Sequence, residues 1–398
     1  MSRPELLTQI STDYGTAPAW LDEKVLLCLL KQEFPSFQSI ENTRIRTEPN
    51  SLRVQIQAKL AENASRTINF VVKSQELSKV TRLRFPQASL GNFQMEQHMY
   101  KVVIPALETL YKDANRSISF SPTSYKPKTL PTPKESSCLY LEDLQAKGFR
   151  VVNQLKGLDQ VSMEVMLSKL AAYHAATARY LQLNPHQLKE LSKLESNKEP
   201  AQDIQNLKIW LQRKFHESLR ANDLREYEDK VKSFQRHIAE DIDSPDLKKS
   251  FNVILTGACW SNNLLGQFDA FGQLKDVAFY QFGSVTYGPV VQDLLQLLLT
   301  APAQKTEQFD ACLRYYRDEL AANLKLLKFE GKLPTLTDIQ LDLLDYGHCA
   351  FEVITEILPI VLTDFGCEDI DEMFKLSKYS EEIKILLPWL ENRGYFEA

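Results

Sequence analysis

The sequence lacks the marks of several protein classes. None of its six cysteines is spaced as a CxxC pair, which argues against a zinc site or a disulfide framework and favours free thiols in a reducing compartment. Its most apolar runs, Leu294–Leu299 and Ile357–Leu362, are far shorter than the roughly 20 residues that a membrane span needs. The N-terminus has no apolar core long enough for a signal peptide. We therefore predict a cytoplasmic protein.

An excess of charge of either sign is also missing. The formal net charge is −5, so neither nucleic acid nor an anionic membrane is expected as a partner. Glycine is scarce near the start, since none occurs between Gly15 and Gly91. Loops whose backbone approaches a triphosphate normally use glycines. The sequence therefore predicts no glycine-rich phosphate loop in this stretch.

The composition itself is that of a globular protein, with 43% hydrophobic and 25% charged residues. A chain of 398 residues is too long for one compact core, so two lobes are expected. Residues 1–142 are predicted to hold an N-terminal helix over 19–34, an antiparallel strand pair, a second helix and a hinge strand. Residues 143–398 are predicted to form a mainly helical lobe.

The strand pair ends in the first candidate site residue. Apolar and polar residues alternate over 52–60, and 67–73 is predicted as the returning strand, with Lys73 at its end. In the helix predicted over 92–103, Glu96 falls on an otherwise apolar stripe and needs a cationic partner, for which Lys73 is the natural candidate. Such a pair orients a nucleotide phosphate in kinase-like folds. The alternatives are an ordinary structural ion pair, or a lysine whose ammonium lies in water.

The hinge strand follows a loop. Residues 111–137 are rich in proline and serine and are predicted as a loop with a short strand near Ile118 and Phe120. The apolar strand that begins at Cys138 then ends abruptly in Glu142 and Asp143. We place the boundary between the lobes at this point.

The second lobe contains two polar residues on apolar faces. A long helix over 162–183 places His174 on its apolar stripe, where a hydrogen-bonded core residue is favoured over a metal ligand. Asp293 lies in a nearly all-apolar helix over 289–299 and needs hydrogen bonds, for which a nearby loop backbone is the expected partner. The charge-rich stretch 184–250 is predicted to form one or two solvated surface helices.

The most informative stretch is Val253–Leu265. Two apolar runs flank a polar turn, which is the layout of a strand, a functional loop and a return strand. The next predicted strand, 277–280, runs into a second polar turn at 281–283. Both turns have the spacing of a phosphotransferase centre, but the acids of such a centre are absent. The nearest acids in sequence, Asp269 and Asp276, are not expected to substitute for them.

These motifs together resemble the ecdysteroid-kinase-like family, the insect-expanded branch of the choline kinase and aminoglycoside phosphotransferase fold. The resemblance covers roughly residues 20–380, and the order of the motifs carries it. The motifs are the segments 93–105, 139–150, 170–175, 259–263 and 287–294. The resemblance implies an α+β, two-lobed protein-kinase-like fold with a small antiparallel-sheet N-lobe and a larger, mostly helical C-lobe. It also implies phosphoryl transfer from ATP to a hydroxyl of a small molecule, with ecdysteroids as the named substrate.

The resemblance also assigns positions, and three of them depart from the family. The family's His-Gly-Asp-x-x-x-x-Asn loop falls on 256–263, so Thr256 stands at the His position and Ala258 at that of the catalytic Asp. The family's Asp-Phe-Gln motif falls on 281–283, which places Gln281 at the metal-binding Asp. The positions that would contact the nucleotide are Lys73, Glu96, Leu141, Glu142, Asn263 and Gln281, and those that would act as structural anchors are His174 and Asp293.

These departures decide the predicted function. Losing the general base alone costs about 10²–10⁴ in rate, and Ala258 has no atom that could act as a base. Magnesium prefers anionic oxygens, whereas Asn263 and Gln281 offer neutral ones. We therefore predict a pseudokinase with a binding or scaffolding role and no intact catalytic residue. No cofactor is certain: ATP is left open and magnesium is not expected.

Its partner would be a small apolar or hydroxylated molecule, or another protein. The alternative is an active small-molecule kinase that phosphorylates an ecdysteroid-like or other metabolite by an altered mechanism. The third hypothesis is a degenerate family member that binds no ligand.

Overall fold

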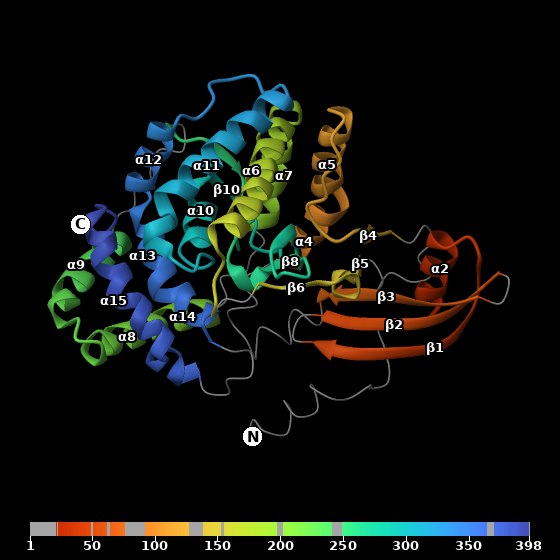
Figure 1. The fold of residues 1–398 in the computed structure, drawn as a ribbon, viewed down its shortest axis with the longest axis horizontal. Helices are drawn as coiled ribbons and strands as arrows, with labels where there is room; N and C mark the ends of the chain where they lie inside the picture. The colour runs from red at the N-terminus through yellow and green to blue at the C-terminus, as the bar shows by residue number, and fades with distance from the viewer. Residues whose placement is uncertain are drawn as a thin grey trace.

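The chain forms a small lobe built on an antiparallel sheet and a larger lobe made mainly of helices, which is an α+β, two-lobed kinase-like fold (Figure 1). The computed structural model describes residues 21, 23–48, 51–61, 64–75, 92–126, 138–152, 155–196, 202–240, 249–363 and 370–397.

The N-terminal sheet has the strand order β1-β2-β3-β5-β4, and all neighbouring strands are antiparallel. Its strands are β1 (Phe37–Glu48), β2 (Ser51–Leu60), β3 (Ser65–Ser74), β4 (Ser124–Tyr125) and β5 (Cys138–Glu142). Helix α2 (Glu23–Glu33) packs on one face of the sheet through a shared apolar cluster. The predicted N-terminal helix and strand pair are therefore confirmed. The predicted strand near Ile118 and Phe120 is wrong, because the strand of that region is β4.

The helix that carries Glu96 is longer than predicted. It begins as α4 (Phe93–His98), passes through one π-helical turn (Met99–Val103) and continues as α5 (Ile104–Asp113). Pro105 does not end it, because proline lies in the first turn of α5, where its missing N–H costs little. The side chain of Asn92 caps α4 by accepting hydrogen bonds from the backbone N–H groups of Gln94 and Met95.

The C-terminal lobe is built around the long helices α6 and α11, which pack against each other (Figure 1). Its helices are α6 (Gln160–Leu183), α7 (Gln187–Ser196), α8 (Gln202–Ala221), α9 (Glu228–Glu240), α10 (Val291–Leu298), α11 (Lys305–Leu326), α12 (Leu336–Asp345), α13 (Gly347–Glu352), α14 (Leu358–Val361) and α15 (Ser377–Asn392). A π-helical turn (Val353–Ile357) joins α13 to α14. Short 3-10 turns cover Leu144–Lys147, Arg225–Tyr227, Ser261–Asn263 and Ile370–Lys375.

The stretch predicted as one or two solvated helices differs from that prediction. The described part of 184–250 contains α7, α8 and α9, and Phe215, Leu219 and Phe234 are buried in the main core. The charged residues cover only the outer faces, and the apolar faces of α8 and α9 dock on the lobe. Within the part of the chain that the structure describes, no helix is both long and apolar enough to cross a membrane.

Two small sheets hold the loops of interest. Strands β6 (Phe149–Val151), β8 (Leu264–Phe268) and β9 (Leu274–Phe279) form one antiparallel sheet, and β7 (Asn252–Ile254) pairs with β10 (Tyr287–Pro289). The predicted layout of a strand and its return strand around the polar turn is therefore wrong. The chain leaves β7 and joins a different sheet at β8, so the loop between them links the two sheets.

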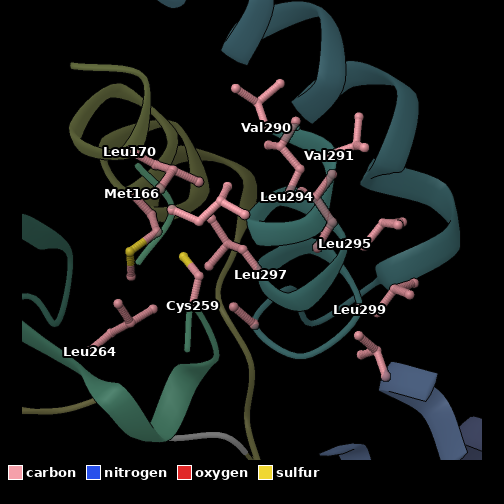
Figure 2. Close-up of a cluster of buried hydrophobic side chains, with 14 of the residues drawn as sticks. Met166, Leu170, Cys259, Leu264, Val290, Val291, Leu294, Leu295, Leu297 and Leu299 are labelled. Carbon is pink, nitrogen blue, oxygen red and sulfur yellow. The ribbon is translucent and has the colours of Figure 1, made fainter. Parts of the chain in front are cut away.

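The loop between β7 and β8 is anchored on the core of the large lobe. Figure 2 shows Cys259 among the apolar side chains of α6 and α10, including Met166, Leu170 and Leu297. All four side chains are fully buried. Burial of these side chains fixes the middle of the loop against the helices, so its polar residues are presented from a rigid base.

Candidate functional site

Lys73 and Glu96 form the predicted ion pair. Lys73 lies at the end of β3 and Glu96 on α4, with the Lys73 Nζ atom 2.6 Å from Glu96 Oε1. Both residues are buried, with exposed fractions of 4% and 6%. The structure therefore excludes the reading in which the Lys73 ammonium lies in water.

Two further groups accept hydrogen bonds from Lys73. Its Nζ atom lies 3.0 Å from the carbonyl oxygen of Tyr280 and 3.4 Å from Oε1 of Gln281, both on the turn after β9. A lysine ammonium has three N–H donors. With Glu96, the protein supplies three acceptors for these three donors. The ammonium is thus enclosed by the protein itself, between the sheet, α4 and the second polar turn.

The turn after β9 is held by the same helix. The Tyr100 hydroxyl donates to the Tyr280 carbonyl at 3.0 Å, and the ring of Phe282 packs edge-on against Tyr100 with centroids 5.3 Å apart. The backbone N–H of Asn92 donates to the carbonyl of Gly283 at 2.7 Å. The position of Gln281 is consequently fixed from both sides by contacts of its neighbours.

The residues that the resemblance assigns to the metal positions do not fit magnesium. Gln281 presents a neutral amide oxygen that already accepts from Lys73. The amide of Asn263 donates to the carbonyl oxygen of Ala258, 3.2 Å away in its own loop. Among the described residues, no three His, Cys, Asp or Glu side chains gather in a group that could hold a metal ion. Magnesium needs anionic oxygen ligands, and this donor set offers none.

Asp293 holds the first polar loop in place. This fully buried carboxylate on α10 accepts from the backbone N–H of Thr256 at 2.7 Å, the Thr256 hydroxyl at 3.0 Å and the backbone N–H of Gly257 at 3.1 Å. Its fourth partner is Nε2 of His174 at 3.1 Å, whose Nδ1 lies 2.6 Å from the Tyr316 hydroxyl. The expected loop-backbone partner of Asp293 and the hydrogen-bonded core role of His174 are both confirmed.

The conformation of this loop depends on Gly257. Its φ angle is +70°, and a Cβ atom there would lie 1.9 Å from the carbonyl oxygen of Ser284. The two polar turns therefore touch through their backbones at this glycine. Ala258, next in the chain, is buried and offers only a methyl group at the position that the resemblance assigns to the catalytic Asp.

The hinge residues are engaged within the protein. Leu141 is buried in β5, between β3 and β4. The backbone N–H of Glu142 donates to the Thr123 carbonyl at 2.9 Å, while its carboxylate accepts from the Thr123 hydroxyl and pairs with Lys147. The structure thus separates the predicted residues into three groups: Lys73, Glu96 and Gln281 meet in one cluster, Thr256, His174 and Asp293 in another, and Leu141 and Glu142 lie at the hinge.

Sequence reasoning missed an ion bridge beside the hinge. Arg53 on β2 pairs with Glu48 at the end of β1 and with Asp143 just after β5. Burial raises the pKa of Tyr280 to about 12, with the charge of Glu48 adding to the rise and that of Arg53 opposing it. The alternation of β2 places Arg53 on the polar face of the strand, but the partners of Arg53 follow only from the register of the sheet.

The two acids not expected to substitute for the missing ones lie elsewhere. Asp269 accepts backbone hydrogen bonds from Phe271 and Gln273 in the turn between β8 and β9. Asp276 lies within β9 and pairs with Lys169 at 2.8 Å.

Comparison with known proteins adds a family and two structures. The model of a family described as "Ecdysteroid kinase-like family" matches residues 50–329, which is more than half of the chain. Among solved structures, the amicoumacin kinase hAmiN in complex with AMP-PNP, Ca2+ and Ami shows 12% identity and a TM-score of 0.37, covering 92% of this chain and 94% of its own. The aminoglycoside phosphotransferase APH(3'')-Id from Streptomyces rimosus shows 8% identity and a TM-score of 0.29, covering 77% of this chain and 96% of its own. No curated protein matches the sequence.

Proposed function

We propose, from the premise that this chain belongs to the ecdysteroid kinase-like family, that it is a pseudokinase. In this proposal the protein keeps a kinase-like cleft and acts through it by binding or scaffolding, without transferring phosphate. The ligand would be a small apolar or hydroxylated molecule or a protein partner.

The observation that carries the proposal is the enclosure of Lys73. In kinases the corresponding lysine contacts the phosphates of the nucleotide. Here its three donors face Glu96, the Tyr280 carbonyl and the Gln281 amide. A phosphate would have to displace the Gln281 amide without a metal ion to neutralise its remaining charge. The lysine therefore supports the arrangement of the lobes more readily than it binds a triphosphate.

The two substituted positions act on the same step. A carboxylate at 258 would take the proton of the attacking hydroxyl, and a carboxylate at 281 would hold the metal that stabilises the transferred group. Ala258 offers no base and Gln281 no charge. Because both losses raise the energy of the same transition state, their effects on the rate would compound.

The test is a phosphoryl-transfer assay with magnesium and ATP on ecdysteroids and other hydroxylated metabolites, together with thermal melts in nucleotide with and without magnesium. We expect no product and no magnesium-dependent shift of the melting midpoint. Magnesium-dependent product that disappears in Lys73→Met, but persists in the matched surface variant Lys147→Met, would instead establish the active phosphotransferase with an altered mechanism. The Lys147 side chain is 61% exposed, so that variant controls for loss of a lysine alone.

The proposal also includes a cytoplasmic location and an insect source for the protein. None of the five described cysteines is in a disulfide bond, which supports a reducing, cytoplasmic compartment. The family resemblance supports an insect source. Fractionation of the source cells, with the protein found in the cytosolic fraction, would check the first point.

A further inference from the structure

We propose that Arg53 is a specificity-determining residue of the cleft, and that the ion bridge it forms with Glu48 and Asp143 keeps a purine base out. This inference rests on the proposed function, because it concerns what the non-catalytic cleft accepts. It adds that the described conformation is closed to ATP for a reason independent of the missing acids.

The strand register places Arg53 on the cleft side of the sheet. Arg53 pairs with Val71 across β2 and β3, and Val71 pairs with Leu141 on the hinge strand. Residues directly opposite in a sheet share a face, as do residues two apart in one strand. Arg53 therefore shares the face of Lys73, and the partners Val71 and Leu141 pack on the core of the large lobe. The apolar cluster with α2 lies on the opposite face.

The ion bridge of Arg53 crosses β3, the central strand of the sheet, on the face that carries Lys73. Its two carboxylates stand on opposite sides of β3, since Glu48 ends β1 and Asp143 follows β5 in the order β1-β2-β3-β5. To reach Asp143 from β2, the Arg53 side chain must pass under β3 near Val71. On the side of the large lobe, the Tyr280 ring centroid lies 5.5 Å from the Lys73 Nζ atom, and the Tyr280 hydroxyl donates to the Asn262 carbonyl at 3.2 Å.

A purine in a kinase-like cleft would need this same space. Its base must lie between the N-terminal sheet and the large lobe, toward the hinge, when the phosphates point to Lys73. The flat, largely apolar faces of a purine ring are bound best by apolar side chains above and below the ring. Arg53 places a guanidinium there, and the side-chain exposed fractions of Arg53 and Asp143 are 19% and 9%. A base could enter only by displacing a partly buried charge from two carboxylates, which would be left without their partner.

The hinge reinforces this exclusion. Backbone groups at a hinge can bind the edge of a base, but the N–H of Glu142 already donates to the Thr123 carbonyl. Asp143 is fixed as well, because its carboxylate accepts from the backbone N–H of Gln145 and caps the following 3-10 turn. The acceptor of the bridge is therefore held in place by the hinge itself.

The experiment measures adenosine binding by calorimetry to the full chain carrying Arg53→Val. Adenosine has no phosphate, so neither Ala258 nor Gln281 affects the result. We expect the variant to bind at least tenfold more tightly than the unmodified protein. The matched control is Arg46→Val, because Arg46 lies directly opposite Arg53 on β1 and is exposed; it should leave the affinity unchanged. Asp143→Asn, which loosens one end of the bridge, should give a smaller gain.

Equal affinity of the unmodified protein and Arg53→Val for adenosine, whether measurable or absent in both, would overturn the proposal. Arg53→Met serves as a second variant with the same expected gain, and thermal melts verify that both are folded. The outcomes are separable from the proposed function: adenosine binding by the unmodified protein as tight as by Arg53→Val would refute the exclusion and leave the pseudokinase proposal intact. Phosphate transfer would refute the pseudokinase proposal, whatever adenosine does.

Discussion

The anchoring of the first polar loop by Asp293 can be tested by Asp293→Asn, a change that keeps the size of the side chain and removes its charge. Four donors surround the carboxylate: the N–H and hydroxyl of Thr256, the N–H of Gly257, and Nε2 of His174. Thr256 N and His174 share Oδ2, while the Thr256 hydroxyl and Gly257 N share Oδ1. Each carboxylate oxygen thus accepts from one backbone N–H and from one side chain, which is the Thr256 hydroxyl, able to rotate, or the His174 imidazole, able to change tautomer.

An amide cannot satisfy this arrangement in either orientation. With its nitrogen at the Oδ2 place, the new NH₂ group faces the N–H of Thr256; with its nitrogen at the Oδ1 place, it faces the N–H of Gly257. The hydroxyl and the imidazole can become acceptors, but a backbone N–H cannot. One buried N–H is left unpaired, at about 1–3 kcal/mol, and the other bonds lose the charge of their acceptor. We expect Asp293→Asn to lower the free energy of unfolding by about 2–4 kcal/mol.

Urea denaturation followed by tryptophan fluorescence measures this loss. Asp293→Ala, which removes the acceptor from all four donors, should lose more than Asp293→Asn. The control is Asp318→Asn, because Asp318 makes an exposed pair with Arg317 and should change stability by less than about 1 kcal/mol. The reasoning would fail if Asp293→Asn were as stable as the unmodified protein.

Two further changes test other parts of the structure. Burial raises the pKa of Glu356 to about 7, so the folded state keeps a proton that the unfolded chain loses above about pH 4.3, and stability should fall from there to about pH 7. Glu356→Gln should abolish this fall, worth about 3–4 kcal/mol, in urea denaturation across that range; an unchanged pH dependence would contradict it. Gly257→Ala should lower the free energy of unfolding by at least about 3 kcal/mol, because the new Cβ atom would meet the backbone of Ser284. Gly272→Ala is the control: its φ is +83° but the space around it is open, so it should lose only about 1–2 kcal/mol. Equal losses in the two variants would contradict the close approach at Gly257.

Short sequence patterns predicted those elements of the fold that depend on residues close together in the chain. The alternation over 52–60 and the returning strand gave β2 and β3, and the single carboxylate on an apolar stripe led to the Lys73–Glu96 pair. That inference worked because a buried carboxylate needs a cation, and one lysine lay at the end of a strand on the same side. The pair was predictable from the energetic cost of burying an unpaired carboxylate, and not from the spacing of a motif.

Other parts depend on partners that a local pattern does not reveal. Strand β1 escaped prediction because two register irregularities, at Phe37/Ser39 and Ile40/Asn42, break its period of two, and Ile45 is its only buried residue. The strand that pairs with β7 is β10, more than 30 residues away, because residues 256–259 bind α10 and the chain then forms the separate β8–β9 hairpin. For the same reason the Arg53 bridge needed the register of three strands before its partners became apparent.

The loop around Ala258 keeps its shape for reasons that do not involve the side chain at that position. Asp293 binds the backbone before it, and Gln296 accepts from the N–H of Cys259 after it at 2.8 Å. Asn263 donates to the carbonyl of Ala258, not to its side chain. A carboxylate at 258 could therefore be exchanged for a methyl group without loss of these bonds. A loop held from behind in this way keeps its shape whichever side chain stands at position 258, so the family likeness shows the architecture and not the chemistry.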